Sequence, residues 1–236
     1  MIDAAGSRTG LILGSSSPRR SALLRQVGAR FSVRTADTDE SLHNATQPEV
    51  YVSELSRRKA DAVSASITNG DAVWDDFERV IIIGADTVVV GSGGCILGKP
   101  KDGADARRML ETLSGKWHEV YTGVALIEKF KAECGAGNAR ARRGESHFSE
   151  PLGCKAYPTL VEYEVTRVRM RVLNDDTIDL YIKTGEPDGK AGAYAIQGAG
   201  SLLVDRIEGC YNNVVGLPLR LLGSMLDVMG YNLLKK

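Results

Sequence analysis

Apolar residues in the first part of the chain alternate between short continuous runs and a helical spacing of three to four residues, which predicts alternating strands and helices. Thr9–Leu13 is such a run and predicts a short buried strand, which Gly14 and three serines interrupt. Pro18 suits the first position of a helix, with Ser17 as its N-cap and Gly28 as its end. The sequence therefore predicts a strand, a tight turn and a helix in direct succession.

The longest apolar run of the chain covers residues 80–90 and gives its strongest strand signal, interrupted by Gly84 and by the polar pair Asp86 and Thr87. Before it, residues 46–49 match a capping box and predict the start of a helix. The remaining predictions for this half are a strand at 31–35, a hairpin turn at 92–94, a helix capped by Asp102 and ending at Leu113, and a strand at 117–127.

The second half begins with residues 128–158, which are rich in Gly, Ala, Arg and Lys and lack periodicity, so we interpret them as an inserted loop. Beyond it the apolar alternation changes phase, which predicts a β-bulge or a bend near Thr166. The elements predicted after this point are a helix at 177–183, a glycine-rich loop at 185–200, a strand at 202–207 and a helix at 218–229. Together the elements predict one α/β domain (α+β, with a mixed sheet) over residues 1–236.

Composition narrows the classes of function. The chain has 236 residues, enough for a substantial core, and its 30 basic residues balance its 30 acidic ones. This balance argues against nucleic acid or a membrane surface as the main partner. No apolar run approaches a membrane span and the first ten residues lack a secretory core, so we expect a cytoplasmic protein.

The turn at residues 14–20 is the first candidate for chemistry. A strand, a turn of small residues and a helix N-terminus aim backbone N–H groups and a positive dipole at one point. Ser15 and Ser17 add hydroxyl groups, and Arg19 and Arg20 add positive charge that opposes the dipole unless an anion is bound. We favour an anion site over an ordinary capped helix with two solvated arginines.

Three charged residues are further candidates. Lys59 lies on the apolar face of its predicted helix, so it either has a buried partner or extends from the edge of that face to solvent. Asp86 stands in an apolar run, where a carboxylate needs a metal ion, a cation or a set of hydrogen bonds; the alternative is an aspartate that caps a turn. Glu40 offers a second metal ligand, although an acidic run of this kind is otherwise typical of a solvated loop.

The glycine-rich loop at 185–200 is the last candidate. Glycines allow a backbone to approach a ligand closely, and Gln197 carries both a donor and an acceptor, which suits the edge of a nucleobase. The alternative is a flexible loop without a ligand.

In combination these segments resemble the Maf family of nucleotide pyrophosphatases, which has an inosine-triphosphatase-like fold with two lobes around a central cleft. The resemblance covers most of the chain apart from the termini and the insertion. It rests on five stretches in the family's order: GSSSPRRSALLRQVG, ELSRRKADAV, IIIGADTVVV with ILGKPKD, MLETLSGKWHEVYTGVALI, and YIKTGEPDGKAGAYAIQG with YNNVVGLPL.

The resemblance implies a reaction, a cofactor and a set of site residues. The reaction is hydrolysis of dTTP- and UTP-type nucleotides to monophosphate and pyrophosphate with Mg²⁺ or Mn²⁺, as nucleotide-pool house-cleaning, by a cytoplasmic homodimer. The implied residues are Ser15, Ser17 and Arg20 for the phosphates, Lys59 for the triphosphate, Glu40 and Asp86 for the metal and the attacking water, and Arg19, Lys99 and Gln197 for the base.

Two alternatives stay open at this point. One is a pyrophosphatase for 7-methyl-GTP or another modified nucleotide; the 7-methyl-GTP subfamily characteristically carries tryptophan where this chain has Arg19. The other is a nucleotide-binding regulator of cell division without turnover.

Overall fold

The computed structural model describes residues 8–39, 47–131 and 159–235. Within these residues a seven-stranded sheet has the order β2-β1-β3-β5-β6-β7, with β4 paired to β3 outside this path. β1 is parallel to β2 and to β3, and the other pairings are antiparallel. The strands are β1 (Thr9–Leu13), β2 (Ser32–Val33), β3 (Arg79–Val90), β4 (Ile96–Leu97), β5 (Trp117–Phe130), β6 (Thr159–Met170) and β7 (Val204–Glu208).

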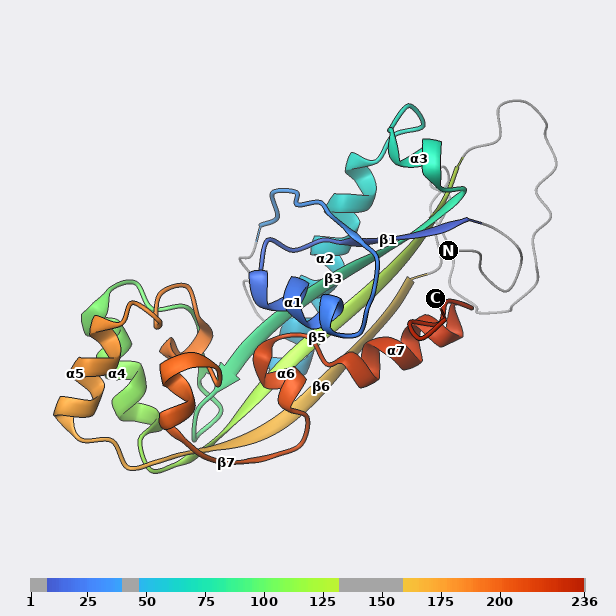
Figure 1. Cartoon of the computed structure of the whole chain (residues 1–236). Coiled ribbons are helices and arrows are strands. Elements are labelled where there is room, and N and C mark those ends of the chain that lie inside the picture. Colours follow the sequence, from blue (N-terminus) through green and yellow to red (C-terminus); the bar gives the residue numbers. More distant parts are fainter. Residues whose placement is uncertain (1–7, 40–46, 132–158, 236) are drawn as a thin grey trace.

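Two lobes are joined by the long strands β3, β5 and β6, which extend from the lobe of α2 and α3 to the edge of the lobe of α4 and α5 (Figure 1). One lobe contains α1 (Pro18–Gln26), α2 (Pro48–Ser66), α3 (Val73–Asp76), α6 (Tyr211–Val215) and α7 (Leu219–Val228). The other contains α4 (Gly103–Leu113), α5 (Asp175–Lys183), and the 3₁₀ segments η1 (Ala191–Ala193) and η2 (Gly198–Leu202). The predicted mixed α/β fold with two lobes is confirmed.

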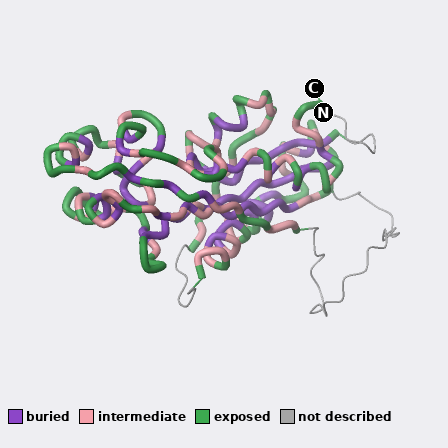
Figure 2. Tube along the Cα trace, turned by 90° about the horizontal axis from the view of Figure 1, so that it is seen from below, coloured by how far each residue is buried: buried purple, intermediate pink, exposed green. Residues whose placement is uncertain are grey.

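Alternate residues of β3 face different cores, because successive side chains of a strand point to opposite faces of the sheet. Ile81 and Ile83 pack in the core with α1 and α7, whereas Val80 and Ile82 pack against α2. The third core lies in the other lobe, between the sheet, α4 and α5. The burial view shows these buried stretches along the strands, with exposed residues on the surrounding turns (Figure 2).

Helix α2 lies unusually close to the sheet because two glycines of β3 and β5 have no side chain there. A Cβ on Gly84 would stand 2.2 Å from the carbonyl oxygen of Ser56, and a Cβ on Gly123 would stand 2.2 Å from that of Val52. Asp86 follows Gly84 by two residues and therefore faces α2 as well. This close packing brings the next turn of α2, which carries Lys59, to Asp86.

Most predicted elements are confirmed, some with identical bounds. β1 covers the predicted residues, and Asp102 caps α4 by accepting a hydrogen bond from the Asp105 N–H at 2.8 Å. Gly28 follows α1 with φ of +73°, as expected for a helix end. Ser17 does occupy the N-cap of α1, but its side chain makes no capping hydrogen bond.

Three predictions need correction. The bulge near Thr166 is wrong: β6 pairs with β5 without interruption from Thr159 to Arg169, and the register shift lies on the β7 side, between Arg169 and Met170. The apolar phase changes because the two ends of β6 bury opposite faces, one against α2 and one against α4 and α5.

The capping box at residues 46–49 is also not observed, since the N-cap of α2 is Gln47 without a side-chain capping bond, and Thr46 lies outside the described residues. The insertion begins later than predicted, because β5 extends to Phe130 and Glu128 pairs with Ile81 in the ladder. Residues 132–158 lie outside the described ranges. α3 and α6 were not predicted.

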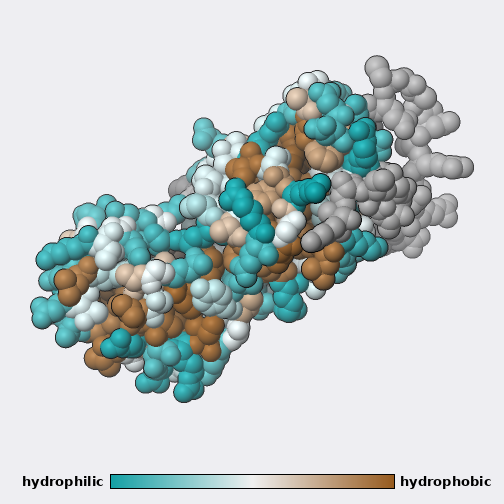
Figure 3. Space-filling model, in the orientation of Figure 1, coloured by the Kyte–Doolittle hydropathy of each residue, from teal (hydrophilic) through white to brown (hydrophobic). Residues whose placement is uncertain are grey.

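Hydrophilic residues cover much of both lobes on the face shown, with smaller hydrophobic patches between them (Figure 3). In the described ranges no helix combines the length and the apolarity that a membrane crossing requires.

Candidate active site

A cleft of about 740 Å³ lies beside a gap in the sheet. β1 pairs with β3 as far as Ile83, and β4 pairs with β3 only from Val89 onward. Residues 84–88 of β3 lie between these two pairings, and Asp86 and Thr87 of this segment line the cleft. β1 ends at the same place and continues into the turn before α1, so the cleft lies at the carboxyl end of a parallel strand, where ligands of α/β proteins bind.

One wall of the cleft, which we call the turn side, consists of residues 14–20 with Lys59 and Asp86. Among the described residues, three hydrogen bonds hold Arg20 there. Its Nε donates to the carbonyl oxygen of Gly216 at 2.8 Å, and its two terminal nitrogens donate to Ser15 Oγ and Thr87 Oγ1, both at 3.1 Å. A guanidinium group with three fixed acceptors is oriented before any ligand binds.

Ser15 has a donor to offer a ligand. Its Oγ accepts from Arg20 and from the Ser17 N–H at 3.2 Å, and among the described residues it donates to no acceptor. The hydroxyl therefore adds a neutral donor beside the Arg20 charge and the N-terminus of α1, a combination that suits an anion.

Lys59 and Asp86 form an ion pair across the α2–β3 contact, with 2.6 Å between Nζ and Oδ1. Their side chains are only 17% and 12% exposed. The pair explains why a lysine lies on an inward helical face and why a carboxylate is tolerated in an apolar strand. Of the two alternatives that the sequence left open for Lys59, the structure shows the buried partner, and that partner is Asp86.

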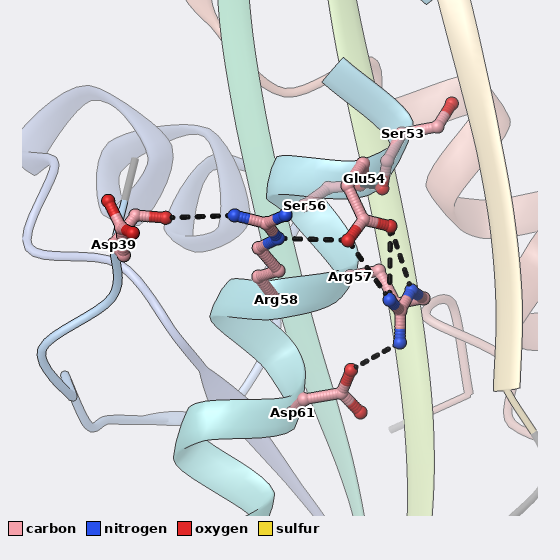
Figure 4. Close-up of polar contacts among 7 residues, drawn as sticks. All are labelled: Asp39, Ser53, Glu54, Ser56, Arg57, Arg58 and Asp61. Carbon is pink, nitrogen blue, oxygen red and sulfur yellow. Dashed lines mark hydrogen bonds and ion pairs between the residues drawn. The ribbon is translucent and has the colours of Figure 1, made fainter. Parts of the chain in front are cut away.

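The segment that carries Asp37 borders the same cleft and is tied to α2 by an arginine. Arg58 donates to the backbone oxygen of Asp39 at 3.4 Å and to Glu54 Oε1 at 2.9 Å (Figure 4). Glu54 is held in turn by Arg57. This network fixes the last described residues before Glu40, which itself lies outside the described ranges.

The opposite wall, which we call the loop side, consists of Lys99 and residues 188–194. The glycine-rich loop that forms this wall is held by hydrogen bonds, unlike the flexible loop that was the alternative. Glu186 accepts from the N–H groups of Ala199 and Gly200 at 2.8 and 3.1 Å, and these bonds are the main reason that the pKa of its carboxyl is lowered. Tyr181 of α5 accepts from the Ala195 N–H at 3.2 Å. Glu186 therefore joins the two ends of the loop, and Tyr181 ties the loop to α5.

Arg19 and Lys190 bring two positive charges to the cleft from opposite walls. Burial lowers the pKa of Arg19, while Tyr181 raises it. Burial also lowers the pKa of Lys190, and the charge of Arg19 lowers it further. Two cations that are partly desolvated and repel each other favour an anionic or carbonyl-rich ligand between them.

The cleft brings together most of the predicted site residues: Ser15, Ser17, Arg19, Arg20, Lys59, Asp86 and Lys99. Gln197 is different. It is exposed, precedes η2 and is not among the residues that line the cleft.

Several residues that shape the cleft were missed by the sequence analysis. Thr87 contacts Arg20 directly, and its polarity within the apolar run was its only signal. Gly216 supplies a carbonyl group to Arg20, and Glu186 anchors the glycine-rich loop. A contact through a backbone carbonyl leaves no trace in residue type, so Gly216 could not have been identified from the sequence.

The cleft suits a divalent metal ion that is bound together with a phosphate ligand. Asp86 Oδ2 accepts no hydrogen bond within the described residues, and Asp37 lines the same cleft. The described residues contain no group of three or more side chains with metal-binding potential. Mg²⁺ often binds through one or two carboxylates plus substrate phosphates, so this donor set fits such an ion without a complete protein cage.

Similar proteins cover nearly the whole chain. Proteins named dTTP/UTP pyrophosphatase from Acetivibrio thermocellus and Caldicellulosiruptor bescii are 43% and 42% identical over 226 and 225 residues. The alignments span 96% and 95% of this chain and 98% and 97% of those proteins. A protein of the same name from Hahella chejuensis is 42% identical over 93% of this chain and 92% of its own length. The family profile described as Maf-like protein matches residues 10–229, and the chain therefore belongs to the Maf family.

Proposed function

We propose that this protein hydrolyses dTTP and UTP to the corresponding monophosphate and pyrophosphate. One observation carries the proposal: the Lys59–Asp86 pair lies in the same cleft as an oriented arginine and an anion-binding turn. The three relatives described above are named for this reaction, which supports the same substrate class here.

The turn side holds the triphosphate in this proposal. Arg20, Lys59 and the Ser15 hydroxyl, together with Ser17 and the helix N-terminus, supply donors and positive charge for the phosphate oxygens. They are fixed before binding, so they need little reorganisation as negative charge builds on the leaving pyrophosphate. Their distances support this role, since each group already has a defined orientation.

Asp86 accepts the proton of the attacking water. The reaction adds water across the α–β phosphoanhydride bond, so a nearby base is needed to take up a proton. Asp86, with Glu40 and the phosphates, would hold Mg²⁺ or Mn²⁺, which supplies Lewis-acid stabilisation of the phosphate charge. Lys59 holds the Asp86 carboxylate in place through the 2.6 Å contact.

Lys99 of the loop side, Arg19 of the turn side and Gln197 select the base in this proposal. Arg19, Lys99 and Gln197 are proposed to pair with the carbonyl groups of thymine or uracil, and Lys190 lies close enough to Arg19 to contribute. A site built around polar partners disfavours bases that leave those partners unpaired. The exposed position of Gln197 implies that it reaches the base only when substrate is bound. A role in cleansing the nucleotide pool, a homodimer and a cytoplasmic location stay predictions.

A nucleotide panel with Mg²⁺ tests the proposal directly. Purified protein is incubated with dTTP, UTP, dATP, dGTP and 7-methyl-GTP, and pyrophosphate and orthophosphate are measured separately. We expect pyrophosphate as the first product, and faster release from dTTP and UTP than from the purine nucleotides. Orthophosphate as the first product would assign cleavage to a different bond, fastest cleavage of 7-methyl-GTP would favour the modified-nucleotide alternative, and triphosphate binding without turnover would favour the regulator.

A further inference from the structure

A line of buried polar groups connects the cleft to α6 on the face of the sheet opposite to Asp86. Thr87 Oγ1, which accepts from Arg20, lies 2.9 Å from Thr122 Oγ1 on the paired residue of β5. Thr122 donates in turn to the carbonyl oxygen of Asn213 in α6 at 3.1 Å. Thr122 and Asn213 are completely buried, although the surrounding core is apolar. We call Thr87, Thr122 and the Asn213 carbonyl group the hydroxyl chain.

The direction of every hydrogen bond in the hydroxyl chain follows from counting protons. A threonine hydroxyl has one proton, and that of Thr122 is used on the Asn213 carbonyl, which can only accept. Thr122 must therefore accept from Thr87, whose own proton is then used. Thr87 has only lone pairs left for Arg20, whose guanidinium can only donate. The chain thus runs one way, from Arg20 to α6, and presents an acceptor to the arginine.

The far end of the hydroxyl chain is anchored to two strands. The side-chain nitrogen of Asn213 donates to the carbonyl oxygen of Val120 in β5 at 2.9 Å and to Thr166 Oγ1 in β6 at 3.0 Å. Thr166 in turn bonds both the carbonyl oxygen and the N–H of Cys210, the N-cap of α6. α6 is therefore fixed on the sheet by polar contacts from both strands.

The same short helix also reaches Arg20 directly. The carbonyl oxygen of Gly216, the residue that ends α6, accepts from Arg20 Nε at 2.8 Å. Arg20 is thus tied to α6 twice, once through Gly216 and once through the hydroxyl chain. Two connections to one anchored element restrict rotation of the guanidinium plane more than either alone.

We propose that Thr87, Thr122 and Asn213 are positioning residues that set the orientation of Arg20 toward the polyphosphate. The proposal rests on the function proposed above, in which Arg20 binds the phosphates. Stability alone explains these buried polar residues less well. Replacing both partners of a buried hydrogen bond by apolar groups of the same shape can be nearly neutral for stability, so the fold does not require the hydroxyl chain. Here the buried polar atoms form a directed line that ends on Arg20, a cation of the cleft with three acceptors among the described residues.

Substitution at Thr122 tests the proposal without touching the cleft. Thr122→Val keeps the shape but removes the acceptor of Thr87, whereas Thr122→Ser keeps the hydroxyl. We expect Thr122→Val to lower kcat/KM for dTTP by about 3–10-fold, the range typical of losing one hydrogen bond between neutral groups, with Thr122→Ser close to wild type. Thr9→Val, which removes another buried threonine hydroxyl from the same sheet, is the matched control and should keep wild-type kcat/KM.

A double-mutant cycle separates positioning from general disruption. Arg20→Lys keeps a charge but loses the forked donors that the hydroxyl chain orients. If the chain acts through Arg20, Thr122→Val should cost little further activity in the Arg20→Lys background. Losses that multiply in full in the double variant, or an unchanged kcat/KM for Thr122→Val, would overturn the proposal.

A readout that needs no turnover keeps this test apart from that of the proposed function. In ¹⁵N NMR of the full chain, rotation of the Arg20 guanidinium should be slow in the wild type and in Thr122→Ser, and faster in Thr122→Val. Should the wild type release no pyrophosphate, the proposed function fails, yet the NMR result still decides whether the chain orients Arg20. Equal rotation rates in all three proteins would reject the chain itself.

Discussion

The two walls of the cleft are built in different ways. On the turn side, Arg20 has three fixed acceptors and Lys59 is paired with a buried carboxylate. On the loop side, Lys99 is exposed, and Gln197 lies beyond the cleft lining. Under the proposed function, the groups that bind the phosphates are held in place before binding, whereas base selection relies on more exposed side chains.

Replacing Asp86 should give the largest loss of activity, and comparing it with an acid of the loop side tests the difference between the two walls. Asp86→Asn removes the proposed base with almost no change of shape, and pyrophosphate release from dTTP should fall by about 10²–10⁴-fold. The matched control is Asp188→Asn, an exposed acid on the loop side of the same cleft, which should keep most activity. Thermal unfolding of both variants checks the fold, and wild-type-like turnover of Asp86→Asn would remove this residue from the mechanism.

The close packing of α2 on β3 at Gly84 gives the next prediction. Gly84→Ala places a Cβ against the Ser56 backbone and should lower the free energy of unfolding by about 3 kcal/mol, at the upper end of typical overpacking costs. It should also reduce activity by moving Lys59 away from Asp86. On the loop side a Cβ on Gly98 meets nothing within 4 Å, so Gly98→Ala should leave stability near the wild-type value. Urea unfolding curves measure both, and equal stability of the two variants would contradict the tight α2–β3 contact.

A buried histidine beneath the loop side predicts how that lobe responds to acid. His118 Nε2 lies 2.7 Å from the hydroxyl of the cleft-lining Tyr194, and burial lowers the pKa of His118 to about 4. The unfolded chain, with a histidine pKa of about 6.5, binds the proton first as the pH falls. Stability from this group is therefore lost between these two pKa values.

The measurement is the free energy of unfolding at pH 7 and pH 4.5 for the wild type and for His118→Gln, which keeps a hydrogen-bonding group but does not titrate. The wild type should lose about 2–3 kcal/mol more than the variant over this interval. Parallel losses in the two proteins would mean that His118 titrates normally.

The smallest expected effect concerns the loop side itself. Lys99→Ala should lower kcat/KM for dTTP by about 10-fold and reduce the preference over dGTP, because one polar partner of the base is lost. Lys101→Ala, two residues away and outside the cleft lining, serves as the control. An equally large loss of activity on all nucleotides would contradict the proposal that the loop side acts in base selection and the turn side in phosphate binding.

The residues of the turn side could be predicted from the sequence because they lie in one contiguous motif or stand out as charged residues at buried positions. The turn before Pro18 is a contiguous motif, and the inward position of Lys59 follows from helical spacing alone. The pairing of Lys59 with Asp86 needed the fold, since 27 residues separate them. Gly84 was noted only as an interruption, although it is the reason that the two charges meet.

The sequence analysis missed features that depend on which helices pack against each stretch of a strand. The phase change in β6 resembled a bulge because a sequence pattern cannot show that two helices bury opposite faces of one continuous strand. The hydroxyl chain escaped detection for a related reason: Thr87, Thr122 and Asn213 come from distant segments, and each is unremarkable in its own surroundings.

The continuous ladder of β3 with β5 has a further mechanical consequence. It holds twelve successive residue pairs, from Arg79 with Phe130 to Val90 with Glu119, and β5 and β6 continue it without a break. Because this ladder joins both lobes without a break in the described residues, we expect the lobes to move little relative to each other when a nucleotide binds. The strands and helices of a ligand-bound structure should then superimpose on this one as a single rigid body, with any closure confined to the segments that border the cleft.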